Sequence, residues 1–115
     1  MIAGLAPQKS ATNEVNAMSV NTTVSGDVVT IHVAGRFDFA THQDFLRAYK
    51  EYPKGEKNFV VDLQSTDYMD SSAMGMLLQL REHASQASPI KLANGNDGIK
   101  EILRIANFDK LFSVA

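Results

Sequence analysis

The sequence predicts an α/β sandwich with a mixed, mostly parallel sheet of four to five strands, an N-terminal hairpin and three to four helices. The alternation of two kinds of segment along the chain supports this fold class. Segments rich in β-branched residues alternate with segments whose apolar residues recur at helical spacing. Parallel strands need a crossover connection, usually a helix, so this alternation indicates parallel pairing after the hairpin. The chain has 115 residues, which is enough for one such domain.

The predicted hairpin lies at the start of this domain. Residues 20–24 (VNTTV) and 28–34 (VVTIHVA) are rich in β-branched side chains, and the segment 25–27 between them contains a glycine. Gly35 ends the second strand, and residues 36–40 are expected to form a loop that leads to the first helix.

The first helix is expected over residues 42–52, with Thr41 as its N-cap. Pro53 and Gly55 end it. One apolar face is predicted from the i, i+1, i+4 and i+7 positions of Phe45, Leu46, Tyr49 and Tyr52.

The second half of the chain continues the alternation. Residues 58–63 form a short apolar run typical of a strand covered on both faces. A strand at 90–93, a turn at 94–98 and a last strand at 111–114 follow later. Between them, one helix starts near Ser71 with an apolar stripe at Ala73, Leu77, Leu80, Ala84 and Ala87. Another helix places Ile99, Ile102, Leu103 and Ala106 on one face.

Composition excludes several classes of function. The chain has no cysteine, so disulfides, thiolate metal sites and cysteine nucleophiles are ruled out, as suits a reducing compartment. A net charge of -2 gives no electrostatic reason to bind nucleic acid or an anionic membrane. The apolar runs are too short to cross a bilayer. We therefore expect a soluble, cytoplasmic protein whose partner is a protein or a small molecule.

Residues 1–17 (MIAGLAPQKSATNEVNA) differ from the rest, because they show neither hydrophobic period and lack the basic and apolar regions of a secretory signal. They are expected to be a flexible N-terminal extension, either native or a vector remnant. The domain itself is expected to occupy residues 18–115.

A catalytic constellation is one interpretation of the polar residues. Ser71, His42 and Asp38 are the residue types of a nucleophile, a base and an orienting acid. A nucleophile elbow, however, places its serine in a G-x-S-x-G turn directly after a strand, and here seven residues separate the predicted strand from Ser71. No paired metal-ligand spacing connects the three histidines, His32, His42 and His83. We expect no enzyme, no metal and no cofactor.

A polar cluster at the start of the second helix has two interpretations. Asp70 or Ser71 is a suitable N-cap, which would stabilise the helix by about 1 kcal/mol. Capping alone leaves unexplained why Asp67, Asp70, Ser71 and Ser72 gather directly after a buried strand, where ligand sites of parallel sheets usually lie.

The stretch VVDLQSTDYMDSSAMGMLL resembles the signature of STAS domains, in particular the small stand-alone anti-sigma factor antagonists. The matching positions are Asp62, Leu63, Met69, Asp70, Ser71, Ser72, Ala73, Met74 and Gly75. The segment GRFD at 35–38 and the closing segment GIKEILRIANFDKLFSV also resemble the family, so the likeness covers about 20–114. Ala73 and Met74 depart mildly from the commoner Gly and Leu.

The resemblance implies a phospho-switch. In such antagonists the first serine of the pair, here Ser71, is phosphorylated by an anti-sigma factor that is also a serine kinase, and a PP2C-type phosphatase reverses the modification. The unphosphorylated form binds the anti-sigma factor and frees the sigma factor. The resemblance implies a monomer that contacts its partner through Asp38, Asp67, Met69, Asp70, Ser72, Met74 and Gly75.

Two further possibilities stay open. The partner could belong to another signalling complex or to a lipid ABC transporter. Met69, Met74 and Met76 could form an adaptable apolar contact patch, although a core role is at least as plausible for two of them.

Overall fold

The computed structural model describes residues 19–115, so the extension expected at 1–17 lies outside the described residues. A five-stranded sheet has the order β2-β3-β5-β7-β8. Its strands are β2 (Val20–Ser25), β3 (Val28–Val33), β5 (Asn58–Asp62), β7 (Lys91–Ala93) and β8 (Ser113–Val114). The helices are α1 (His42–Lys50), α2 (Ser71–His83) and α3 (Asp97–Ile105), with the 3-10 turns η1 (Phe39–Thr41) and η2 (Phe108–Lys110). The predicted α/β sandwich is confirmed.

Strand pairing follows the predicted plan. β2 and β3 form the antiparallel hairpin, in which Val20 pairs with Val33 and Ser25 with Val28. The pairs β3 with β5, β5 with β7, and β7 with β8 are all parallel. The carboxyl ends of β3, β5 and β7 therefore lie at one edge of the sheet, as the helical crossovers require.

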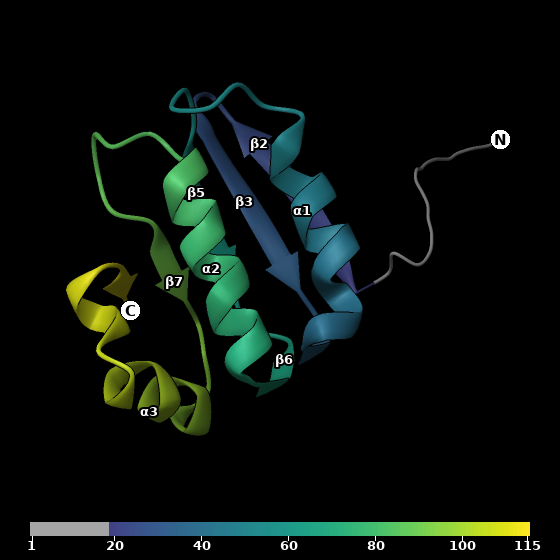
Figure 1. Cartoon of the computed structure of the whole chain (residues 1–115), viewed down its shortest axis with the longest axis vertical. Helices are drawn as coiled ribbons and strands as arrows, with labels where there is room; N and C mark the ends of the chain where they lie inside the picture. The colour runs from purple at the N-terminus through teal and green to yellow at the C-terminus, as the bar shows by residue number, and fades with distance from the viewer. Residues whose placement is uncertain (1–18) are drawn as a thin grey trace, which may run out of the picture.

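The helices α1 and α2 lie side by side over one face of the sheet, and both begin at the same end of the domain (Figure 1). Buried residues alternate along β3 and β5, where Ile31 and Val61 are fully buried and Val60 is only half-buried. The expectation that residues 58–63 are covered on both faces is therefore wrong. The run is apolar at its centre, but α1 and α2 pack on one side only (Figure 1). The half-buried Asn58, Val60 and Asp62 alternate with the buried Phe59 and Val61.

A second, two-stranded sheet was not predicted. β4 (Gly35–Phe37) pairs in parallel with β6 (Thr66–Met69), so part of the expected loop at 36–40 is a strand and the rest is η1. Gly35 adopts a φ of 77°, which glycine tolerates better than any other residue, and its amide donates to the Ser65 carbonyl at 2.8 Å.

Two helix ends also differ from the sequence pattern. α1 ends at Lys50 instead of residue 52, although Tyr52 still packs against the core. α2 ends at His83, so Ala84 is buried at its C-cap, whereas Ala87 is exposed in the following turn. Helical periodicity cannot mark such an end, because small residues suit a turn as well as a helix.

Candidate functional site

The start of α2 and the start of η1 lie next to each other because the short strands before them are paired. In the parallel pair β4 and β6, Arg36 lies opposite Tyr68 and Phe37 lies opposite Met69. Each strand is followed directly by an aspartate, Asp38 after β4 and Asp70 after β6, and then by a helical turn. We call residues 38–41 the Asp38 turn and residues 70–73 the Asp70 turn.

In the Asp70 turn, the aspartate is the N-cap of α2. Asp70 has extended backbone (φ -127°, ψ -172°), and its Oδ1 accepts hydrogen bonds from the amides of Ser72 at 3.0 Å and Ala73 at 3.2 Å. Ser71 is the first residue of α2 and is exposed, whereas Ser72 is half-buried. The capping interpretation is thus confirmed for Asp70, and the cap holds the backbone of the first turn, in which Ser71 is exposed.

The Asp38 turn repeats this arrangement. Asp38 has nearly the same backbone (φ -140°, ψ -168°), and its Oδ1 accepts from the Ala40 amide at 3.0 Å. Its Oδ2 accepts from Arg36 Nε at 3.2 Å. Thr41 is the N-cap residue of α1, as predicted, but its side chain makes no cap bond, because its Oγ1 donates to the Asp38 carbonyl at 2.6 Å instead.

Two exposed aromatic residues at this end were missed from the sequence. Phe39 follows Asp38, as Ser71 follows Asp70, and it is 73% exposed. Tyr68 is 38% exposed, with the Arg36 guanidinium 3.9 Å from its ring centroid. The signal that could have found them is the pair of matching triplets RFD and YMD, each ending in a helix-capping aspartate.

The remaining predicted contact residues fall into two groups. Asp67 is exposed on β6, and Gly75 is exposed on α2 with open space around it. Met69 is only 4% exposed and belongs to the core, as does Met76. The contact role expected for the Met69 side chain is therefore corrected, and the methionine patch reduces to the half-buried Met74.

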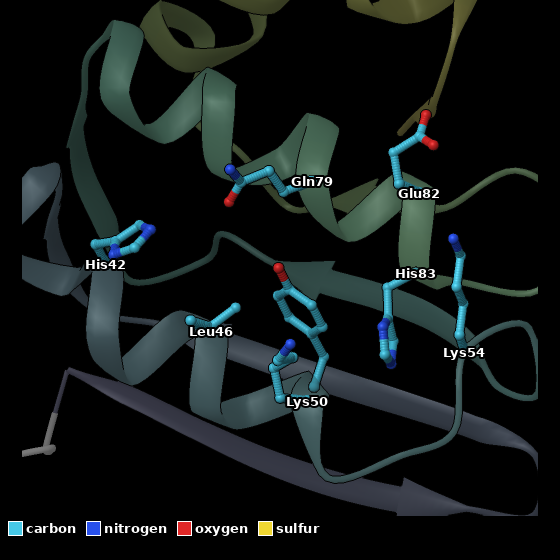
Figure 2. A pocket seen from close by; sticks show the side chains of 8 residues that line it. His42, Leu46, Lys50, Lys54, Gln79, Glu82 and His83 are labelled. Atoms are coloured by element: carbon cyan, nitrogen blue, oxygen red, sulfur yellow. The ribbon is translucent and has the colours of Figure 1, made fainter.

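The catalytic arrangement imagined for Ser71, His42 and Asp38 is not assembled. The Asp38 carboxylate is bonded to Arg36 and the Ala40 amide, and the His42 ring stacks on Phe39 with centroids 5.7 Å apart. Ser71 lies outside the groove of about 380 Å³ between α1 and α2, which His42 lines. Figure 2 shows this groove with His42, Leu46 and Gln79 along it.

His83 makes its contacts within the fold. His83 Nε2 lies 2.6 Å from the Tyr52 carbonyl, and burial raises the pKa of the Tyr49 phenol beside it.

Within residues 19–115, no group of three or more His, Cys, Asp or Glu is placed to hold a metal ion. No helix in the same part of the chain is long and apolar enough to span a bilayer.

A separate polar network crosses the sheet face that is turned away from α1 and α2. His32 Nδ1 lies 2.9 Å from Asp62 Oδ2, and Asp62 Oδ1 accepts from the Asn94 side chain at 3.0 Å and the Gln64 amide at 3.1 Å. Burial alone would raise the pKa of Asp62, but the hydrogen bonds from Asn94, Gln64 and His32 together lower it. This network joins β3, β5 and the segment after β7.

These features define a small α/β domain with a capped serine turn at one end, and comparison with known proteins identifies its family. The family model described as "Mlab, STAS domain" matches residues 20–113. A STAS-domain containing protein of Pseudomonas aeruginosa (strain UCBPP-PA14) is 43% identical over 100 residues, covering 86% of this chain and 99% of that protein. The chain belongs to the STAS-domain family.

Solved structures agree with this fold. An anti-sigma factor antagonist from Mycobacterium paratuberculosis is similar with a TM-score of 0.69 and 15% identity, over 83% of this chain and 82% of that chain. The anti-sigma factor antagonist SpoIIAA in its unphosphorylated form gives a TM-score of 0.54 and 18% identity, over 75% and 82% of the two chains. At these identities the likeness establishes the fold.

Proposed function

We propose that this STAS domain is a cytoplasmic anti-sigma factor antagonist whose binding is switched by phosphorylation of Ser71. The unphosphorylated domain binds an anti-sigma factor that is also a serine kinase, and the sigma factor is released. The kinase transfers the γ-phosphoryl group of ATP to the Ser71 oxygen, with release of ADP and of the hydroxyl proton, and the complex dissociates. A PP2C-type phosphatase then hydrolyses the phosphate ester with water, which restores the serine and yields inorganic phosphate.

The observation that supports this proposal most directly is the position of the Ser71 hydroxyl. Ser71 is exposed at the first residue of α2, and the bonds from Asp70 to the Ser72 and Ala73 amides hold that residue in place. A kinase substrate needs an accessible hydroxyl in a fixed position and no catalytic base of its own. Ser72 fits less well, because it is half-buried and its amide is engaged by the cap.

The charge around Ser71 gives the switch its direction. A phosphate adds about -1.5 to -2 charges at pH 7. The amides of Ser72 and Ala73 already bind the Asp70 carboxylate, so the new anion would lie beside an existing one, with Asp67 exposed on the preceding strand. Two unit charges about 6 Å apart repel by roughly 2 to 3 kcal/mol at an effective dielectric constant of 20. Covering these anions with a partner surface lowers the local dielectric constant and strengthens their repulsion, and an increase of about 1.4 kcal/mol on binding suffices for a tenfold loss of affinity.

Three variants test the proposal. Incubation with the cognate kinase and ATP should label the wild type and the Ser72→Ala control, and should leave Ser71→Ala unlabelled. Calorimetry should find Ser71→Ala bound as tightly as the unphosphorylated wild type, and Ser71→Asp bound at least tenfold more weakly. Equal affinity of both Ser71 variants for the anti-sigma factor would refute the switch.

A second candidate keeps the fold and changes the partner, which would be another signalling complex or a lipid ABC transporter. This candidate stands because the matching family model is described by the name Mlab and not as an anti-sigma factor antagonist. Purification from the native cell separates the two. Recovery of a transporter subunit whose binding is indifferent to Ser71→Asp would favour the second candidate.

A further inference from the structure

Phe39 is the most exposed of the large hydrophobic residues identified in residues 19–115, at 73%. Single exposed hydrophobic residues are common and need no explanation by themselves. Phe39, however, has two contacts that restrict it. The Asp38 cap fixes its backbone through the Ala40 amide, and its ring stacks on His42 at an interplanar angle of 13°. A rigid aromatic ring loses little conformational entropy when it binds.

The neighbours of Phe39 are also typical of binding surfaces. Arg36 lies over the Tyr68 ring and is paired with Asp38, so its guanidinium is held in place while its side chain stays 63% exposed. Arg and Tyr are enriched among residues that dominate binding energy, and Phe is enriched at interfaces generally. The register of β4 and β6 places this group directly beside the Asp70 turn.

We propose that Phe39 anchors the partner that binds the Ser71 surface, by inserting into an apolar socket on that partner. The inference rests on the proposed function and adds the chemistry that the partner must present. Because Arg36 is already paired with Asp38 and Asp67 is exposed at the same end, the feature that the partner must match is the apolar ring and not a net positive charge.

Truncation of Phe39 tests the anchor against a matched control. Phe39→Ala should weaken binding to the purified anti-sigma factor at least thirtyfold, the loss expected of a central interface residue. Phe39→Leu should recover most of that loss, because it still fills an apolar socket. Ile105→Ala removes a side chain of similar exposure, 69%, from the end of α3 that leads into η2, and should bind like the wild type.

The outcomes separate this inference from the proposed function. If Phe39→Ala binds within twofold of the wild type while Ser71→Asp is weakened, the anchor is refuted and the switch stands. If Phe39→Ala and Ile105→Ala weaken binding equally, the effect is not specific and the anchor is again refuted. If Ser71→Asp binds normally while Phe39→Ala does not, the proposed switch fails and the docking surface stands. Thermal unfolding should be unchanged in Phe39→Ala, because surface substitutions usually alter stability by less than about 0.5 kcal/mol.

Discussion

The Asp38 turn and the Asp70 turn follow paired strands and can be compared residue by residue. In both turns, the strand ends in a buried side chain and is followed by an aspartate with extended backbone. The aspartate accepts a hydrogen bond at 3.0 Å from the amide two residues later, and the residue directly after the aspartate is exposed. That exposed residue is Phe39 in one turn and Ser71 in the other. The same local geometry therefore exposes an apolar ring after one of the paired strands and a serine after the other.

The two turns differ in how much structure depends on the aspartate. Asp70 binds two amides and starts a helix of 13 residues with four buried side chains. Asp38 binds one amide and starts a three-residue 3-10 turn, and its second oxygen accepts a hydrogen bond from the exposed Arg36. Equal geometry thus need not mean equal contribution to stability, and substitution of each aspartate measures the difference.

The largest effect is expected for Asp70→Ala. Two amides of the first turn of α2 lose their acceptor, so the free energy of unfolding should fall by about 1 to 2 kcal/mol. Urea denaturation of the wild type and the variant measures this change. Asp70→Asn is the matched control, because asparagine caps about as well as aspartate. A fall below about 0.3 kcal/mol for Asp70→Ala would show that the cap is dispensable.

A smaller effect is expected for Asp38→Ala. One amide loses its acceptor, and the exposed pair with Arg36 contributes little, so the free energy of unfolding should fall by about 0.5 to 1 kcal/mol. Asp67→Ala removes an exposed carboxylate from the same end of the domain and should change it by less than about 0.5 kcal/mol. If Asp38→Ala proves more destabilising than Asp70→Ala, the ranking of the two turns is reversed.

The smallest effect on stability is expected for Asp62, which belongs to neither turn but also accepts several hydrogen bonds. Its pKa is lowered from the reference value of 3.8, so it stabilises the fold above that pH, and the stabilisation is lost as the pH falls through its folded-state pKa. Unfolding midpoints measured from pH 6 down to pH 2 should therefore fall less steeply in Asp62→Asn than in the wild type. Parallel profiles would contradict a role for this network in acid stability.

Much of the fold could be predicted because its signals are local. The β-branched runs at 20–24 and 28–34 and the apolar run at 58–63 each became a strand. The apolar stripe from Ala73 to Leu80 likewise identified the buried face of α2. The Asp70 cap was predictable too, because an N-cap is a short-range hydrogen bond within one turn.

What could not be predicted depends on pairing between distant segments. β4 and β6 are too short and irregular to show a period, and each is stabilised as a strand by the other. Without that pairing, Asp38 looked like a loop residue, the Thr41 hydroxyl was expected to bond the first turn of α1, and Phe39 had no visible relation to Ser71. Met69 looked exposed because its place opposite Phe37 was unknown, although that place buries it.

The pairing of β4 with β6 also determines what kind of epitope this end of the domain forms. Its two halves are separated in the chain by α1 and β5, so they meet only in the folded domain. A synthetic peptide that contains Ser71 and the first turn of α2 carries the hydroxyl without the ring of Phe39 or the guanidinium of Arg36. A protein that binds both halves at once therefore binds the folded domain more tightly than its degraded or unfolded fragments.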